Sequence, residues 1–153
     1  MKIISTILRA IFGAVFIYSG FVKAVDPWGT AYKIEDYLSA FSMSGLAEAI
    51  PWLPIVASVF LCCMEFMIGV LIFFGFYRKP IKIVAAIVIG FFTVLTLVDA
   101  ITNRVDDCGC FGDAIKLTNW ETFWKNVVLD VILAFIFLCE RKITFAKSKV
   151  NSN

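Results

Sequence analysis

Residues 52–76, WLPIVASVFLCCMEFMIGVLIFFGF, contain a single charged side chain, that of Glu65. A helix needs about 20 predominantly apolar residues to cross the hydrocarbon core of a bilayer, so this stretch is long enough to span it. Three other stretches meet the same requirement: residues 3–25, 81–101 and 120–139. The sequence therefore predicts an all-α protein, with one membrane domain over residues 1–153 built as a bundle of four transmembrane helices.

The composition of the whole chain agrees with this class. The chain is 61% hydrophobic and 17% charged, and its mean hydropathy is +0.89. Average proteins are about 45–50% apolar and about 25% charged, so this chain is more apolar and less charged than a soluble protein. The lipid bilayer is therefore its first expected partner. A net charge of +2 without a basic cluster argues against nucleic-acid binding. The absence of histidine from the sequence excludes imidazole catalysis and imidazole metal ligands.

The distribution of Lys and Arg predicts how the chain lies in the membrane. Cytoplasmic segments carry an excess of these cations. In this chain Lys and Arg are concentrated in three regions: Lys2 at the N-terminus, Arg78, Lys79 and Lys82 between the second and third spans, and Arg141, Lys142, Lys147 and Lys149 after the fourth. The connections 26–51 and 102–119 are richer in Asp and Glu. Both termini are therefore expected in the cytoplasm, and these two connections outside it.

The first outer connection, residues 26–51, carries a helical pattern. It begins with the turn-forming sequence Asp26-Pro27-Trp28-Gly29. The apolar residues that follow recur at helical spacing: Ala31, Ile34, Leu38 and Phe41. This pattern predicts an amphipathic helix lying in the membrane interface. Such a helix could cover the second outer connection as a lid or serve only as a surface anchor, and both interpretations stay open.

The second outer connection holds the motif Asp107-Cys108-Gly109-Cys110-Phe111-Gly112-Asp113. Two thiols one residue apart, on the side where disulfides persist, suggest reversible thiol–disulfide exchange. A structural disulfide stabilises mainly by closing a large loop, and this pair would close almost none. Cys108 and Cys110 are therefore the predicted catalytic residues. Asp107 and Asp113 would disfavour a thiolate unless a cation offsets them, and one of them could accept a proton.

The other cysteines do not complete a metal site. Zinc and iron–sulfur clusters need about four ligands, and the remaining cysteines lie at different expected membrane depths. No metal is therefore expected. Cys62 shares a helical face with Glu65, so it is either a small buried apolar residue or a relay for the outer pair.

Charged residues within the spans suggest an ion pair. Such residues are rare in membranes and usually face the bundle interior. Arg9 lies two turns into the first span, and Glu65 is the only charge in the second. An Arg9–Glu65 pair between the two helices is therefore predicted, with a structural role in setting their packing.

A second polar group is expected in the outward half of the bundle. Its members are Lys23, Asp99, Lys125, Asn126 and Asp130. If they converge beneath the cysteines, they could stabilise a thiolate, pass protons or hydrogen-bond a quinone carbonyl. The alternative is that they form polar contacts between helices, which stabilise membrane bundles modestly.

Three segments resemble a known family. Residues 16–23, FIYSGFVK, followed by Asp26-Pro27, resemble the first span of DoxX-like proteins. Glu65 followed by Gly69 and Gly75 resembles their second span. The segment 108–113, CGCFGD, followed by Leu117-Thr118 and residues 120–130, resembles the MauE branch of these proteins. The resemblance covers nearly the whole chain.

This resemblance implies a multi-pass protein of the bacterial cytoplasmic (inner) membrane with a periplasmic cysteine loop. MauE-like proteins are associated with maturing methylamine dehydrogenase, a disulfide-rich periplasmic enzyme, and DoxX-like proteins with membrane redox complexes. The bundle is also similar in plan to vitamin K epoxide reductase-like, quinone-linked thiol oxidases. Those carry two Cys pairs, whereas this chain has one such pair.

The leading hypothesis is a membrane thiol–disulfide oxidoreductase. Cys108 and Cys110 would exchange with a periplasmic thioredoxin-like protein or disulfide-rich client. Electrons would leave to, or arrive from, a quinone or another membrane carrier, and no covalently bound cofactor is expected. A non-catalytic assembly factor for a periplasmic redox protein is the alternative. Transport of a small solute through an oligomer is a third, weaker hypothesis.

Overall fold

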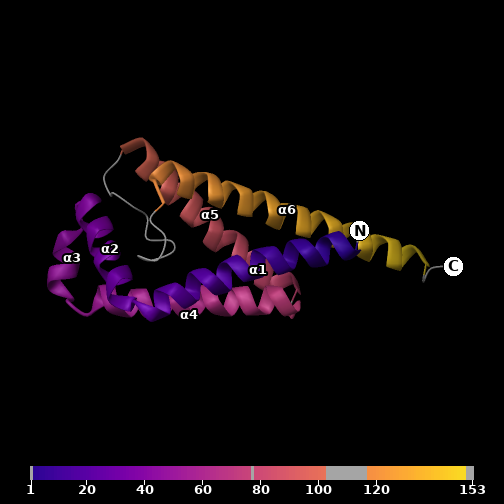
Figure 1. The fold of residues 1–153 in the computed structure, drawn as a ribbon, viewed down its shortest axis with the longest axis horizontal. Coiled ribbons are helices and arrows are strands. Elements are labelled where there is room, and N and C mark those ends of the chain that lie inside the picture. Colours follow the sequence, from indigo (N-terminus) through magenta and orange to yellow (C-terminus); the bar gives the residue numbers. More distant parts are fainter. Residues whose placement is uncertain (1, 77, 103–116, 151–153) are drawn as a thin grey trace.

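The computed structural model describes residues 2–76, 78–102 and 117–150, and Figure 1 shows the course of the chain. The elements within these residues are helices. They are α1 (Lys2–Val25), α2 (Pro27–Ala40), α3 (Ser44–Ala49), α4 (Leu53–Phe74), α5 (Arg78–Thr102) and α6 (Asn119–Val150). The predicted all-α class is confirmed.

Four of these helices are long and apolar enough to cross a membrane, namely α1, α4, α5 and α6. The predicted four-helix membrane protein is therefore confirmed. Helix α6 continues to Val150, although its apolar part ends at Cys139. The sequence prediction marked where apolar composition stops, whereas the helical hydrogen bonds continue through the polar residues that follow.

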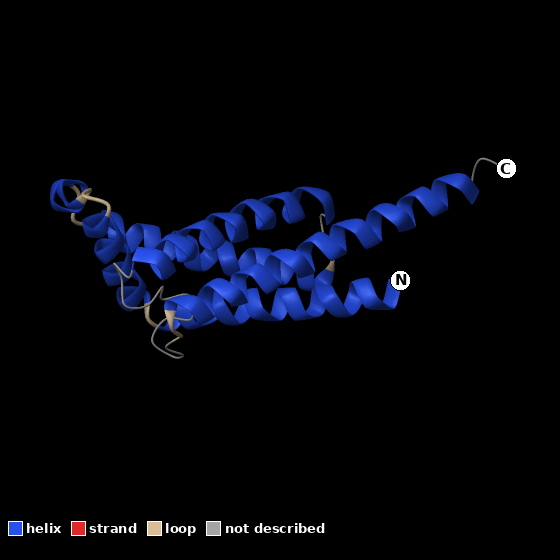
Figure 2. Ribbon diagram, turned by 90° about the horizontal axis from the view of Figure 1, so that it is seen from above, coloured by secondary structure: helices blue, strands red, loops and turns tan. Residues whose placement is uncertain are grey.

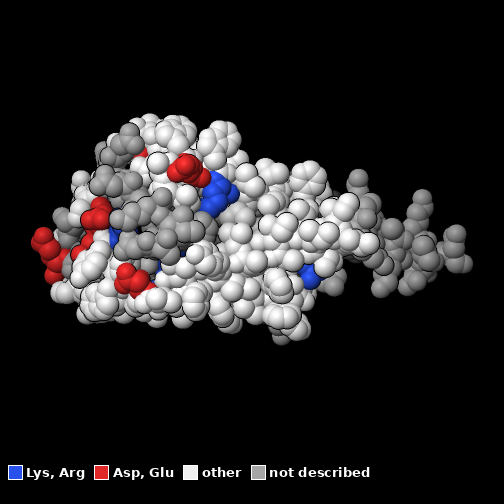
Figure 3. Space-filling model, in the orientation of Figure 1, with Lys and Arg blue, Asp and Glu red and all other residues white. Residues whose placement is uncertain are grey.

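The four long helices run along one another, and the two short ones lie across one end (Figures 1 and 2). We call this the α2 end: α1 and α5 finish there, and α4 and α6 begin there. The N- and C-termini lie toward the opposite end. On the face drawn in Figure 3, acidic side chains gather at the α2 end and the middle of the bundle is almost without charge. A lipid-facing surface has this composition.

Glycines bring α1 and α4 into close contact. A Cβ built on Gly69 would lie 2.6 Å from the backbone nitrogen of Ile17. A Cβ on Gly20 would lie 2.7 Å from the backbone nitrogen of Phe66. Small residues at helix interfaces allow such approach in membranes, where apolar burial against lipid gives little driving force and close packing must supply it.

The apolar core lies where the four long helices meet. It is formed by Phe12, Phe16, Ile68, Ile72, Ala85, Ile89, Leu129, Leu133 and Ile136. The Phe12 and Phe16 rings stack with centroids 4.6 Å apart. Large apolar residues on the outer faces of the same helices are exposed, as lipid contact requires.

Helix α2 forms where the sequence predicts a helix in the first outer connection. Asp26 caps it, because its Oδ1 accepts a hydrogen bond from the Gly29 amide at 2.9 Å, and Pro27 occupies the first turn. Ser58 of α4 donates a hydrogen bond to the Pro27 carbonyl at 2.7 Å, which ties α2 to the bundle. The Trp28 side chain is 59% exposed, as expected for an aromatic residue at a membrane interface. The roles of this helix as lid or anchor stay predictions.

Candidate functional site

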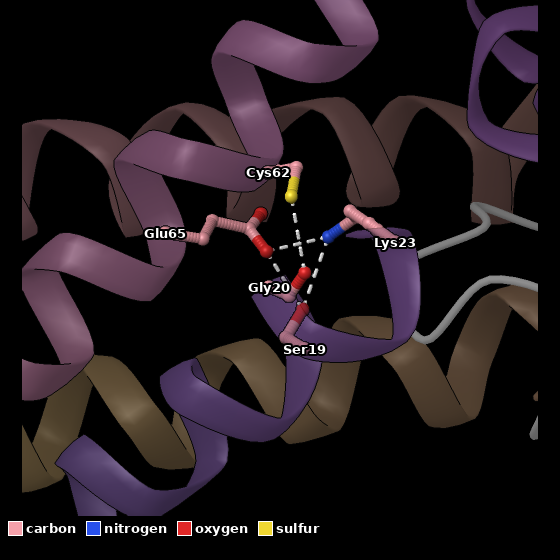
Figure 4. Close-up of polar contacts among 5 residues, drawn as sticks. All are labelled: Ser19, Gly20, Lys23, Cys62 and Glu65. Carbon is pink, nitrogen blue, oxygen red and sulfur yellow. Dashed lines mark hydrogen bonds and ion pairs between the residues drawn. The ribbon is translucent and has the colours of Figure 1, made fainter. Parts of the chain in front are cut away.

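A buried ion pair joins α1 and α4 near the α2 end (Figure 4). Lys23 Nζ lies 2.6 Å from Glu65 Oε2, and their side chains are 4% and 6% exposed. Ser19 Oγ donates a hydrogen bond to the same Oε2 at 2.8 Å and accepts one from Lys23 Nζ at 3.0 Å. Each buried charge is thus paired and hydrogen-bonded, the condition under which charges persist in a membrane interior.

The predicted partner of Glu65 was wrong. The sequence analysis paired it with Arg9, but the ion pair forms with Lys23. Arg9 instead donates a hydrogen bond from Nε to the Ile72 carbonyl at 3.3 Å, and its guanidinium lies over Gly75. Gly75 ends α4 in the left-handed conformation, with φ of 76°, so Arg9 lies near the carbonyl end of that helix.

The physical reason is the register between the two helices. Helices α1 and α4 run antiparallel, and Gly20 packs against Phe66. Glu65 is therefore level with the turn of α1 that contains Ser19. Arg9 lies ten residues before Ser19, which is about 15 Å along the helix axis at 1.5 Å per residue.

Cys62 belongs to the same buried group. Its Sγ donates a hydrogen bond to the Gly20 carbonyl at 3.2 Å, and Figure 4 shows it beside the ion pair. The side chain is buried, whereas that of Cys63 is exposed. Cys62 therefore contributes a hydrogen bond between α1 and α4, and a relay role for it stays a prediction.

Asp99 of α5 is bonded to α2. Tyr37 Oη donates a hydrogen bond to Asp99 Oδ2, and the Asp99 side chain is buried. The sequence analysis singled out Asp99 but missed Tyr37. The helical spacing of Thr30, Ile34 and Tyr37 could have indicated it, since it places these three residues on one face of α2.

Two further residues of the predicted group, Asp130 and Asn126, bridge α5 and α6. Thr93 Oγ1 donates a hydrogen bond to Asp130 Oδ2 at 2.7 Å. Asn126 Nδ2 donates one to Thr96 Oγ1 at 3.3 Å, and both of these side chains are buried. Asp99, Asn126 and Asp130 therefore hydrogen-bond to separate partners.

Two cavities adjoin the ion pair. A small one of about 20 Å³ is lined by Ser19, Glu65, Lys125 and Asn126 together with apolar side chains. A large one of about 440 Å³ lies between α2, α4 and α5 and is almost entirely apolar. Its lining residues are Lys23, Thr30, Lys33, Ile34, Tyr37, Leu38, Phe41, Ala57, Leu61, Phe91, Phe92 and Leu95.

Two features of the large cavity are chemically distinctive. Lys23 Nζ lies 5.7 Å from the centroid of the Phe92 ring, within cation–π range. Thr30 Oγ1 is buried and has no hydrogen-bond partner among the described residues. An unpaired buried hydroxyl is costly, so it is a candidate contact for a bound molecule. The sequence analysis did not single out Thr30.

The predicted catalytic pair, Cys108 and Cys110, lies outside the described residues, as do Asp107 and Asp113. The connection that carries them leaves α5 after Thr102 and enters α6 at Asn119, and both helix ends lie at the α2 end.

A capping box marks the return of the chain into α6. The Thr118 amide donates to Glu121 Oε2 at 2.9 Å, and the Glu121 amide donates to Thr118 Oγ1 at 3.3 Å. These reciprocal bonds define where the connection between α5 and α6 ends.

Comparison with known proteins identifies the family. The family described as "Methylamine utilisation protein MauE" matches residues 1–139. The chain belongs to the MauE family. This MauE family member is 27% identical over 136 residues to "Protein TlpB" of Flavobacterium psychrophilum, a match over 85% of this chain and 35% of that protein. It thus spans about a third of the length of that curated relative. No solved structure matches it.

The family match confirms the resemblance to MauE and, with the four apolar helices, a multi-pass membrane protein. The resemblance of residues 16–23 to DoxX-like proteins stays a prediction.

Proposed function

We propose that the protein is a membrane thiol–disulfide oxidoreductase. In this proposal Cys108 and Cys110 exchange with a periplasmic thioredoxin-like protein or disulfide-rich client. One observation carries it: the connection that holds both cysteines starts and ends at the same end of the bundle as the buried Lys23–Glu65 pair. Ionisable residues at membrane depth are functional candidates, and this pair lies near the end of the bundle where that connection starts and ends.

The proposed orientation places the α2 end in the periplasm of a bacterial inner membrane. The Lys and Arg residues near the termini and in the link between α4 and α5 favour the cytoplasm for the opposite end. Acidic side chains predominate at the α2 end (Figure 3). The cysteines would then meet an oxidising compartment, in which disulfides persist.

The proposed exchange begins when one thiolate of the pair attacks a disulfide sulfur of the client. The client disulfide breaks and a mixed disulfide forms, which the second thiolate then resolves. The client leaves as a dithiol and Cys108–Cys110 becomes a disulfide. Returning the pair to the dithiol form requires two electrons and two protons, which a quinol would supply. In the opposite direction the pair oxidises a client dithiol, and a quinone would accept the two electrons and two protons.

The large cavity fits a quinone as the electron carrier. Its volume of about 440 Å³ lies within the range of about 300–1,000 Å³ that is typical of small-molecule sites. The rings of Phe91 and Phe92 line it, and the unpartnered Thr30 hydroxyl supplies a donor for a carbonyl oxygen. A bound quinone would supply two-electron, two-proton redox chemistry.

Thiol trapping in native membranes tests the proposal. A mass-shifting alkylating reagent reports whether Cys108 and Cys110 are reduced, with and without added quinone and mild reductant. The C108S/C110S variant sets the background from the other cysteines. Cycling between the two forms, with quinone dependence, is the expected result. A pair that stays oxidised and resists mild reductant would overturn it in favour of a non-catalytic assembly factor for a periplasmic redox protein.

A further inference from the structure

The small cavity lies where the two halves of the bundle meet. Ser19 and Glu65 line it from α1 and α4, and Lys125 and Asn126 line it from α6. It therefore separates the buried ion pair from the polar contacts between α5 and α6. Among the described residues no hydrogen bond crosses from Glu65 to Asn126, although both side chains are buried.

Two acceptors at this cavity have unused capacity. The hydrogen bonds from Ser19 and Lys23 both end on Glu65 Oε2, and no described residue donates to Oε1. Asn126 uses its Nδ2 to reach Thr96, and its amide oxygen receives no hydrogen bond from the described residues. A carboxylate and an amide oxygen each accept hydrogen bonds on two lone pairs. A molecule that binds between the Glu65 carboxylate and the Asn126 amide oxygen must therefore donate hydrogen bonds to both.

The cavity has the size and the lining for one water molecule. A buried water needs a cavity of at least about 10–15 Å³ and two to four polar partners. This cavity measures about 20 Å³ and offers the polar groups of Ser19, Glu65, Lys125 and Asn126. A water molecule has two O–H donors for two acceptors and can itself accept a hydrogen bond from the Lys125 ammonium.

We propose that this cavity holds one water molecule that hydrogen-bonds Glu65 to Asn126 and Lys125 and carries protons between Glu65 and the α2 end of α6. The water and its hydrogen bonds do not depend on the proposed function. The use of this route for thiol protons rests on it.

The proton transfer involves no electron transfer. An N–H bond of the Lys125 ammonium breaks as its proton forms a bond to the water oxygen. The water in turn releases one of its own protons to Glu65 Oε1. Lys125 becomes a neutral amine and Glu65 a neutral acid, and the water is restored. Lys125 is suited to the outer end of this route because it lies in the second turn of α6, close to the α2 end.

Infrared spectroscopy of the C108S/C110S variant in membranes tests the water without any client, quinone or thiol chemistry. The Glu65 carboxylate band is assigned as the one lost in E65Q. In the parent it should shift on transfer to D₂O, because the water hydrogen bonded to Oε1 exchanges. V15I adds one methylene to the cavity wall and keeps every polar group, so it should reduce that shift to the part caused by the exchanging protons of Ser19 and Lys23. V59I, on the exposed face of α4, is the matched control and should leave the shift as it is in the parent.

A shift that is the same in V15I and in the parent would overturn the water site. N126L gives an independent check should V15I fail to assemble, because it removes the amide acceptor and should move the same band. The proton route has its own test: K125M should slow deuterium exchange at Glu65 at least several-fold, and K125R, whose guanidinium keeps the charge but does not release a proton, should not restore it. An unchanged rate in K125M would overturn the route.

Discussion

Lys23 near the end of α1 and Glu65 in the middle of α4 form a buried ion pair with an N–O distance of 2.6 Å. The pair couples the two most closely packed helices at the depth where Gly20 allows α1 to approach α4. It also lies between the two cavities, since Lys23 lines the large one and Glu65 the small one. The ion pair is therefore both a packing contact and the centre of the candidate site.

Breaking this pair should destabilise the protein strongly. K23M leaves the Glu65 charge buried without its cation, and such losses cost about 3–5 kcal/mol. Replacing both charges in K23M/E65L should recover much of that loss, because no unpaired charge remains. Denaturant titration in detergent measures both. K79M, at an exposed lysine of α5, is the control, and a K23M protein as stable as the parent would contradict the assignment.

Adding a methyl group at the α1–α4 contact should also reduce stability. In G69A the new Cβ would lie 2.6 Å from the Ile17 backbone nitrogen, so the helices must separate. The matched control is G90A, where a Cβ meets nothing within 4 Å and helix propensity favours alanine by about 0.8–1 kcal/mol. We expect G69A to unfold earlier and G90A no earlier than the parent. Equal midpoints for the two variants would argue against close helix contact.

The Tyr37–Asp99 hydrogen bond should hold α2 against α5. Y37F removes the donor and leaves a buried carboxylate acceptor without it, at a cost of about 1–3 kcal/mol. Amide hydrogen exchange in α2 should therefore become faster, while that of α4 stays unchanged. Tyr32 is 59% exposed, so Y32F is the control. Unchanged protection of α2 in Y37F would show that other contacts hold this helix.

The Thr30 hydroxyl should contribute to binding in the large cavity. T30V is nearly isosteric and removes the only donor there that is buried and unpartnered among the described residues. A hydrogen bond contributes about 0.5–1.5 kcal/mol, so quinone affinity should fall by about two- to twelvefold. Quenching of tryptophan fluorescence by added quinone measures the affinity. T102V, at an exposed threonine, should bind as the parent does, and equal binding by T30V would remove Thr30 from the site.

Thiol exchange should require Cys110. C110S keeps a partner-reactive thiol at Cys108 but cannot resolve a mixed disulfide, so turnover should cease and a trapped adduct with the client should accumulate. Circular dichroism should show an intact helical bundle. C63S, at an exposed cysteine of α4, should exchange normally. Continued turnover by C110S would eliminate the two-cysteine mechanism.

Composition and periodicity determined the four spans and the helix that became α2, because each of these depends on local sequence. The motif at Cys108 and Cys110 and the family resemblance likewise depend on adjacent residues. The partner of Glu65 depended on helix register instead. Sequence order alone could not show that antiparallel packing places Glu65 level with Ser19 and far from Arg9.

The same distinction applies to the rest of the site. The sequence by itself indicated that Asp99, Asn126 and Asp130 are polar residues inside a membrane bundle. The packing of the helices shows that they bond to separate partners and that the Thr30 hydroxyl has no partner among the described residues. The hydropathy of a segment depends only on the composition of that segment. Contacts and cavities between helices depend on the relative rotation, register and spacing of segments that are distant along the chain.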